Sequence, residues 1–139
     1  MRDHVYERHR INSKGTSLMA YTCGDPSRPP VVLVHGYPDD HSVWDSVVAH
    51  LKKDFFVVTY DVRGAGASDH PERQRDYRLS VLSRDLVAVL DHVVPNRAVH
   101  LVGHDWGSIQ SWESVTDPSL RDRFLSYTSL SGPCLDHVG

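Results

Sequence analysis

The segment that most constrains the fold is Gly-His-Asp-Trp-Gly at residues 103–107. It follows an apolar run at residues 98–102 that is typical of a buried strand, and it precedes a helix-compatible segment at residues 108–116. Glycines stand two residues before and two residues after Asp105. The pattern therefore predicts a sharp strand-to-helix turn, with Asp105 exposed at its crest and no room for bulky neighbours.

Strands and helices are predicted to alternate along the chain. The expected strands cover residues 5–11, 17–23, 31–34, 55–60, 98–102 and 125–130, and the expected helices cover residues 43–53, 80–93 and 108–116. The turn residues at positions 12–15 predict a β-hairpin from the first two strands, and Ser80 is expected to cap the second helix. The alternation implies right-handed crossovers, a mostly parallel sheet and one α/β domain over residues 1–139.

Charge and hydropathy argue against several classes of function. The net charge is −3 and the basic and acidic residues are interspersed, so no basic face for nucleic acid is expected. No apolar run approaches the ~20 residues of a membrane helix, and residues 1–8 lack a signal-peptide core. We therefore expect a cytoplasmic protein in which Cys23 and Cys134 are reduced, with pairing of the two as the alternative.

Three motifs, taken in chain order, resemble those of the α/β-hydrolase superfamily. They are His35-Gly36-Tyr37-Pro38, Asp61-Val62-Arg63-Gly64-Ala65-Gly66-Ala67-Ser68-Asp69 and Gly103-His104-Asp105-Trp106-Gly107. The last motif is similar to the nucleophile elbow of the branch that uses Asp, which contains epoxide hydrolases and haloalkane dehalogenases. The dehalogenases typically carry Asn at the position of Tyr37, so the chain looks more like an epoxide hydrolase.

The resemblance implies a nucleophilic role for Asp105. A carboxylate can attack an epoxide carbon without prior deprotonation, and water then hydrolyses the resulting alkyl-enzyme ester to a diol. The backbone N–H groups of Tyr37 and Trp106 would form an oxyanion hole for that second step. The alternative is that Asp105 only caps the helix that follows it.

The other motif residues are expected to shape the site. Three residues are expected to contact the small-molecule substrate, although the last could instead pack in the core: Tyr37, Pro38 and Trp106. Residues with a structural role are expected to be His35, Gly36, Gly103, His104, Gly107, Asp61, Arg63, Gly64 and Gly66. The Gly-x-Gly at residues 64–66 lacks the third glycine of a dinucleotide fingerprint, so we expect no nucleotide cofactor. The histidines show no recognisable metal-ligand spacing, so we expect no metal.

The resemblance covers only the N-terminal portion of the α/β-hydrolase fold. In the resembling families a helical cap and two further strands, which carry the catalytic acid and His, follow the sixth strand. We therefore expect a fragment that is inactive or stalls at the ester, since Asp136 and His137 are poor substitutes for the missing base. Strand 125–130 would be an open edge prone to pair with a second copy. A haloalkane dehalogenase and a non-catalytic binding or assembly domain remain as alternatives.

Overall fold

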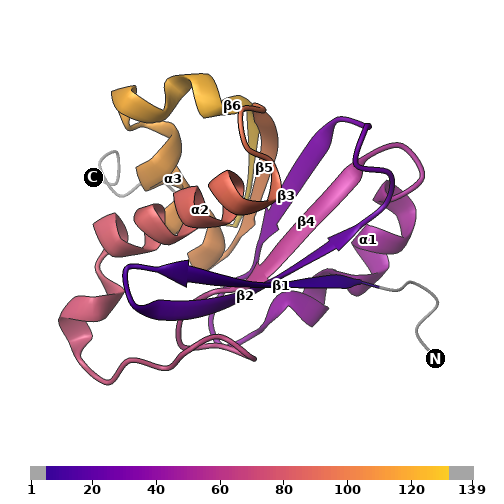
Figure 1. Ribbon diagram of the computed structural model, residues 1–139. Coiled ribbons are helices and arrows are strands. Elements are labelled where there is room, and N and C mark those ends of the chain that lie inside the picture. Colours follow the sequence, from indigo (N-terminus) through magenta and orange to yellow (C-terminus); the bar gives the residue numbers. More distant parts are fainter. Residues whose placement is uncertain (1–5, 132–139) are drawn as a thin grey trace.

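The computed structural model describes residues 6–131, so the expectations for Cys134, Asp136 and His137 lie outside the described part. Six strands form one sheet in the order β1-β2-β4-β3-β5-β6 (Figure 1). They are β1 (Glu7–Ser13), β2 (Thr16–Cys23), β3 (Pro30–Val34), β4 (Phe56–Asp61), β5 (Val99–His104) and β6 (Phe124–Leu130).

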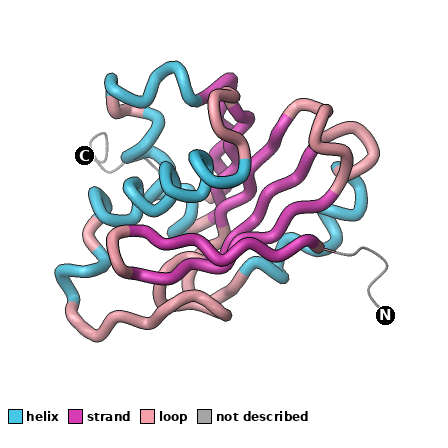
Figure 2. Tube along the Cα trace, in the orientation of Figure 1, coloured by secondary structure: helices cyan, strands magenta, loops and turns pink. Residues whose placement is uncertain are grey.

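Three α-helices and three short 3₁₀ helices connect these strands. The α-helices are α1 (Asp45–Leu51), α2 (Leu79–Val93) and α3 (Trp106–Val115), and the 3₁₀ helices are η1 (His41–Trp44), η2 (Gln74–Tyr77) and η3 (Pro118–Arg123). Figure 2 shows α2 and α3 together on one side of the strands and α1 on the other. Among residues 6–131, no helix has the length and apolar character that crossing a bilayer requires.

The strand pairing confirms an α/β fold with a mostly parallel sheet. Strands β1 and β2 form an antiparallel hairpin, and β2 pairs with β4 in the antiparallel sense. Strands β4, β3, β5 and β6 are mutually parallel, so their carboxyl ends lie at one edge of the sheet. The chain moves from β3 to β4 on one side and later reaches β5 on the other, which makes the β3–β5 boundary the usual place for a ligand crevice.

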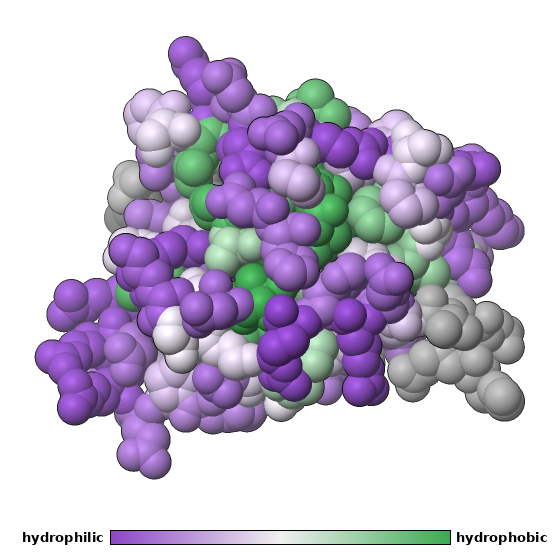
Figure 3. Space-filling view, viewed as in Figure 1, coloured by the Kyte–Doolittle hydropathy of each residue, from purple (hydrophilic) through white to green (hydrophobic). Residues whose placement is uncertain are grey.

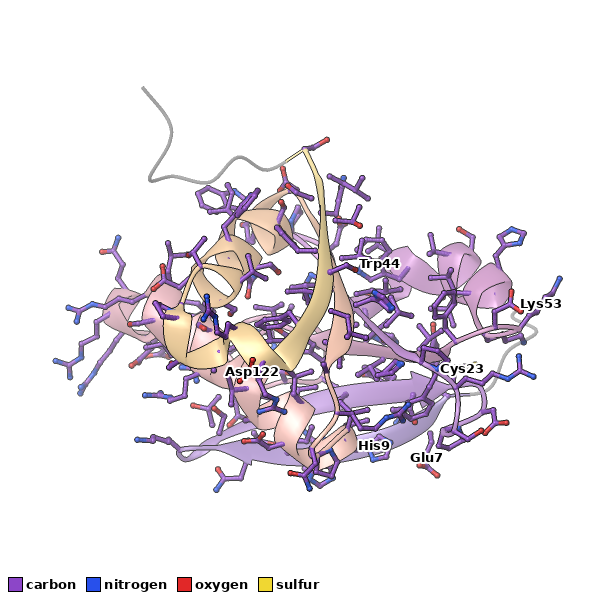
Figure 4. All side chains as sticks on the ribbon, turned by 90° about the horizontal axis from the view of Figure 1, so that it is seen from above. Glu7, His9, Cys23, Trp44, Lys53 and Asp122 are labelled. Carbon is purple, nitrogen blue, oxygen red and sulfur yellow. The ribbon has the colours of Figure 1, made fainter. Side chains whose placement is uncertain are left out.

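The strand residues alternate between two apolar layers. Val32 and Val34 of β3 pack with α2 in the larger cluster, while Val31 and Leu33 face the smaller cluster with α1. Trp44 and Cys23 belong to the smaller cluster, and Figure 4 shows both on the same side of the molecule as α1. Because both faces of the central strands are covered, these strands carry continuous apolar runs.

Some element boundaries differ from the sequence-based predictions. The prediction that Ser80 caps α2 is wrong, because α2 begins at Leu79 with an extended Arg78 as its N-cap residue. The segment before α1 starts as a 3₁₀ helix, whose N-cap Asp40 accepts a hydrogen bond from the Ser42 N–H. Strand β5 runs two residues further than expected, to His104, because its end pairs with β6.

Strand β6 lies at one edge of the sheet formed by residues 6–131. Its Leu125 and Leu130 side chains are exposed, whereas hydrophilic side chains cover most of the face in Figure 3. An exposed apolar edge strand favours pairing with another chain, so dimerisation through β6 stays a prediction. Size-exclusion chromatography with light scattering checks it, and a monomer at high concentration contradicts it.

Candidate active site

Asp105 lies at the strand-to-helix turn that the sequence predicts. It follows β5 and is the N-cap residue of α3, with φ 56° and ψ −125°. A positive φ is rare for a residue with a side chain and costs on the order of 1–3 kcal/mol. The Asp105 N–H donates to the Leu130 carbonyl at 2.9 Å, and its carbonyl accepts from Ser108 and Ile109. The side chain is half-buried rather than fully exposed.

The two glycines of the turn allow close backbone approach. A Cβ on Gly107 would lie 2.3 Å from the Val34 carbonyl oxygen and 2.4 Å from that of His35. A Cβ on Gly103 would lie 2.7 Å from the Cα of Ser108. The beginning of α3 is therefore pressed against the ends of β3 and β5, which fixes the position of Asp105 between them.

Replacing Gly107 with Ala should destabilise the fold by about 1–3 kcal/mol, because the new methyl group overlaps two backbone carbonyls that cannot rotate away. Urea unfolding measures this loss. Gly15→Ala is the control, since a Cβ at Gly15 meets nothing within 4 Å and changes only the cost of a φ of +91°. A smaller loss for Gly107→Ala than for Gly15→Ala would contradict the close approach.

The loop after β3 lies against the Asp105 carboxylate. A Cβ on Gly36 would lie 3.0 Å from Asp105 Oδ2 and 2.9 Å from the His104 carbonyl oxygen. The next residue, Tyr37, is 80% exposed and is joined to Pro38 by a cis peptide bond. Trp106, which follows Asp105, is 53% exposed. The residues that directly follow Gly36 and Asp105 in sequence thus both carry exposed aromatic side chains.

A cavity of about 400 Å³ lies beside this turn. The structure brings together Tyr37, Pro38 and Trp106 in its wall, as expected for substrate-contacting residues. Six further lining residues were not predicted as site residues from the sequence: Asp39, Val62, Ala65, Tyr77, Leu82 and Gln110. Tyr77 is an aromatic residue within a polar stretch, and this was the one feature of the sequence that could have indicated a lining residue.

His35 connects the loop after β3 to the loop after β4. Its Nε2 accepts a hydrogen bond from the Val62 N–H at 3.0 Å, so its Nδ1 is the atom that donates to the Gly36 carbonyl, also at 3.0 Å. Burial lowers the pKa of His35, which favours this neutral tautomer. His104 is half-buried and meets the Trp44 ring edge-on. These contacts support structural roles for both histidines.

Asp61 at the end of β4 joins three segments through its buried carboxylate. Oδ1 accepts from the backbone N–H of His41 at 2.9 Å and from its Nδ1 at 2.8 Å. Oδ2 accepts from the Tyr21 hydroxyl at 2.7 Å and from the Ala67 N–H at 3.0 Å. A Cβ on Gly66 would fall within 2.4 Å of this carboxyl group, so the glycine lets the loop close over it.

The stability of the fold should depend on the ionisation of Asp61. Burial alone would raise the pKa of Asp61, but hydrogen bonds from His41, Ala67 and Tyr21 lower it below the ordinary value of 3.8. As the pH falls, Asp61 therefore takes up its proton in the unfolded state before it does so in the folded state. The stabilisation that ionised Asp61 gives the fold is complete above about pH 5 and is lost below it. Urea unfolding gives the free energy of unfolding near pH 7 and near pH 3. Its decrease between these two pH values should be about 1 kcal/mol smaller in Asp61→Asn than in the wild type. An equal decrease in the wild type and in Asp61→Asn would contradict a role for Asp61 ionisation.

Arg63, which lines the cavity, forms a buried ion pair with Asp85. Arg63 Nε donates to Asp85 Oδ2 at 2.6 Å, and its Nη2 donates to Oδ1 at 2.8 Å. Arg63 Nη1 reaches the Asp76 carbonyl in η2 at 3.0 Å, and Ser13 donates to Asp85 at 2.6 Å. The pair thus ties the loop after β4 to α2, η2 and the hairpin. Tyr77 of η2 packs on Gly64 of the same loop.

Asp40, His41 and Asp61 place three oxygen or nitrogen atoms within 4.8 Å of one another. Hydrogen bonds account for this grouping, because Asp61 Oδ1 pairs with His41. Asp40 Oδ1 accepts from the Ser42 N–H at 2.8 Å and from its hydroxyl at 2.5 Å. The arrangement needs no ion to satisfy these atoms, and the expectation of no metal stays a prediction.

The chain is similar in sequence to two proteins of Mycobacterium tuberculosis. It is 43% identical over 124 residues to "Probable oxidoreductase EphD" of Mycobacterium tuberculosis, covering 89% of this chain and 21% of that protein. It is 36% identical over 127 residues to "Epoxide hydrolase A" of the same organism, covering 90% and 38% respectively. Among solved structures, a mutant epoxide hydrolase of Vigna radiata matches with a TM-score of 0.85 and 29% identity, covering 94% of this chain and 40% of that one.

The chain thus spans less than half the length of these relatives. The family model described as alpha/beta hydrolase fold matches residues 29–138, which include all three motifs. The chain therefore belongs to the alpha/beta hydrolase fold family.

Proposed function

We propose that this chain provides the nucleophile and the oxyanion hole of an epoxide hydrolase. The observation that carries the proposal is the placement of Asp105 at a positive-φ turn, with the Gly36 loop beside its carboxylate and a cavity adjacent to both. Similarity to "Epoxide hydrolase A" supports the choice of substrate class. Tyr37, which stands where haloalkane dehalogenases typically carry Asn, also favours an epoxide over an alkyl halide.

The first chemical step is displacement at a carbon of the strained ring. A carboxylate oxygen of Asp105 forms a bond to the epoxide carbon, the bond from that carbon to the ring oxygen breaks, and the ring oxygen takes up a proton from water to become a hydroxyl. The product is a hydroxyalkyl ester of Asp105. A carboxylate performs this step without a general base, because it is already ionised at neutral pH.

The second step returns the enzyme to its starting state. Water adds to the ester carbonyl carbon, the bond from this carbon to the alkyl oxygen breaks, and a diol leaves as Asp105 is restored. The N–H groups of Tyr37 and Trp106 stabilise the negative oxygen of the intermediate. The proximity of Gly36 to Asp105 supports this assignment, because it brings the loop that contains Tyr37 to the carboxylate.

We further propose that this chain, tested alone, accumulates the ester. General-base activation of water typically contributes ~10²–10⁴-fold, and His35 does not supply it, since both of its ring nitrogens are engaged in hydrogen bonds. Without that contribution hydrolysis is slow, whereas formation of the ester needs only the carboxylate.

Mass spectrometry of the chain after incubation with styrene oxide tests the proposal. The expected result is one stable adduct that peptide mapping places on Asp105. Full turnover to the diol would contradict the accumulation of the ester. An adduct formed with an alkyl halide but not with an epoxide would indicate dehalogenase chemistry, and no adduct with either would favour a non-catalytic role.

A further inference from the structure

The cavity beside Asp105 is bounded by four segments that are distant in sequence. It lies between the loops after β3 and β4, the segment from η2 into α2, and the first turns of α3. Its volume of about 400 Å³ is within the ~300–1,000 Å³ of small-molecule sites. Its wall contains mainly apolar and aromatic side chains, among them Tyr37, Pro38, Val62, Tyr77, Leu82 and Trp106.

The cavity adjoins the reacting carboxylate through two of its lining residues. Gly36 lines it, and a Cβ at that position would lie only 3.0 Å from Asp105 Oδ2. Trp106 lines it as well and directly follows Asp105. An epoxide whose carbon meets the Asp105 carboxylate would therefore have one substituent near Gly36 and Trp106, both of which line this cavity.

The two buried ionisable groups in the wall, Arg63 and His35, are engaged with other groups. Arg63 is 5% exposed, and its guanidinium donates to the Asp85 carboxylate and the Asp76 carbonyl. Burial lowers the pKa of His35, and its Nε2 accepts a hydrogen bond from the Val62 N–H, so the ring is neutral. Asp39 is exposed to water, and Gln110 is uncharged. The wall therefore favours apolar groups over ions.

We propose that this cavity holds an apolar substituent of the epoxide, so that it selects epoxides with longer alkyl chains. The inference rests on the proposed function, since it assumes attack by Asp105. Each methylene that becomes buried in the transition state raises the rate by up to about fourfold. Octene oxide should therefore alkylate Asp105 at least about tenfold faster than propylene oxide at equal concentration.

The test measures the rate of Asp105 alkylation in the full chain by intact-mass spectrometry with these two epoxides. Leu82→Trp fills the cavity and should lower the rate ratio of octene oxide to propylene oxide to near unity. Ser80→Trp adds the same side chain at an exposed position of α2 and should keep the wild-type ratio. Ala65→Phe narrows the cavity from the loop after β4 and gives an independent variant if Leu82→Trp does not fold.

The outcomes separate the inference from the proposed function. A ratio that Leu82→Trp and Ala65→Phe both leave unchanged overturns the inference, even though Asp105 reacts. A ratio that Ser80→Trp lowers equally overturns it as well. The absence of any adduct with both epoxides overturns the proposed function together with the inference.

Discussion

Asp105→Asn is expected to lower the rate of adduct formation with styrene oxide by at least about a thousandfold, since loss of a nucleophile removes the reaction path itself. The neutral amide has nearly the same shape, but it lacks the ionised oxygen that attacks carbon. The backbone hydrogen bonds of residue 105 to Leu130, Ser108 and Ile109 do not involve its side chain. The variant should therefore fold like the wild type, and the rate is measured by intact-mass spectrometry.

Glu113→Gln is the matched control for this substitution. Glu113 is exposed on α3, the helix that Asp105 precedes, and its replacement by Gln likewise converts a carboxylate to an amide. It should leave the rate unchanged. Equal rates for Asp105→Asn and the wild type would mean that another carboxylate is alkylated, and peptide mapping would then identify it.

Asp85→Leu should lower the free energy of unfolding by about 3–5 kcal/mol, because it leaves the Arg63 guanidinium buried without its counter-ion. Both side chains are almost inaccessible, at 3% for Arg63 and 2% for Asp85. The substitution also removes the acceptor of the Ser13 hydroxyl. Urea unfolding near neutral pH measures the loss.

Two comparisons distinguish an effect of the ion pair from a general effect of substitution. Asp91→Asn breaks the Arg123–Asp91 pair, in which Asp91 is 61% exposed, and should cost less than about 1 kcal/mol. Combining Arg63→Met with Asp85→Leu should recover most of the free energy of unfolding that Asp85→Leu loses, because no charge is then left buried. A double variant as unstable as the sum of the two single variants would contradict this account.

The order and type of the elements were predictable because they depend on local patterns. The apolar runs of β3 and β4 and the glycines around Asp105 can be recognised within a few residues of sequence, although the contacts that require them are distant in sequence. The start of α2 was less predictable, since Ser80 is a good cap residue in isolation. The structure instead has an extended Arg78 as the N-cap residue and begins the helix at Leu79.

The candidate site was predictable only in part, because its residues are held by partners that are distant in sequence. The residues in the three motifs could be named from the sequence, but the partners that hold them could not. Asp85 lies on a helix 22 positions from Arg63, and Tyr21 lies 40 positions from Asp61. Such pairs form only when the sheet and helices pack, so a single sequence carries no local signal for them.

The backbone at the crest between β5 and α3 is fixed by glycines and main-chain hydrogen bonds rather than by the side chain of residue 105. The side chain of residue 105 makes no capping hydrogen bond to α3, so it does not hold the turn that presents it. A lineage with this architecture can change the class of bond it attacks by altering one functional group, provided that the surrounding proton donors and acceptors adapt.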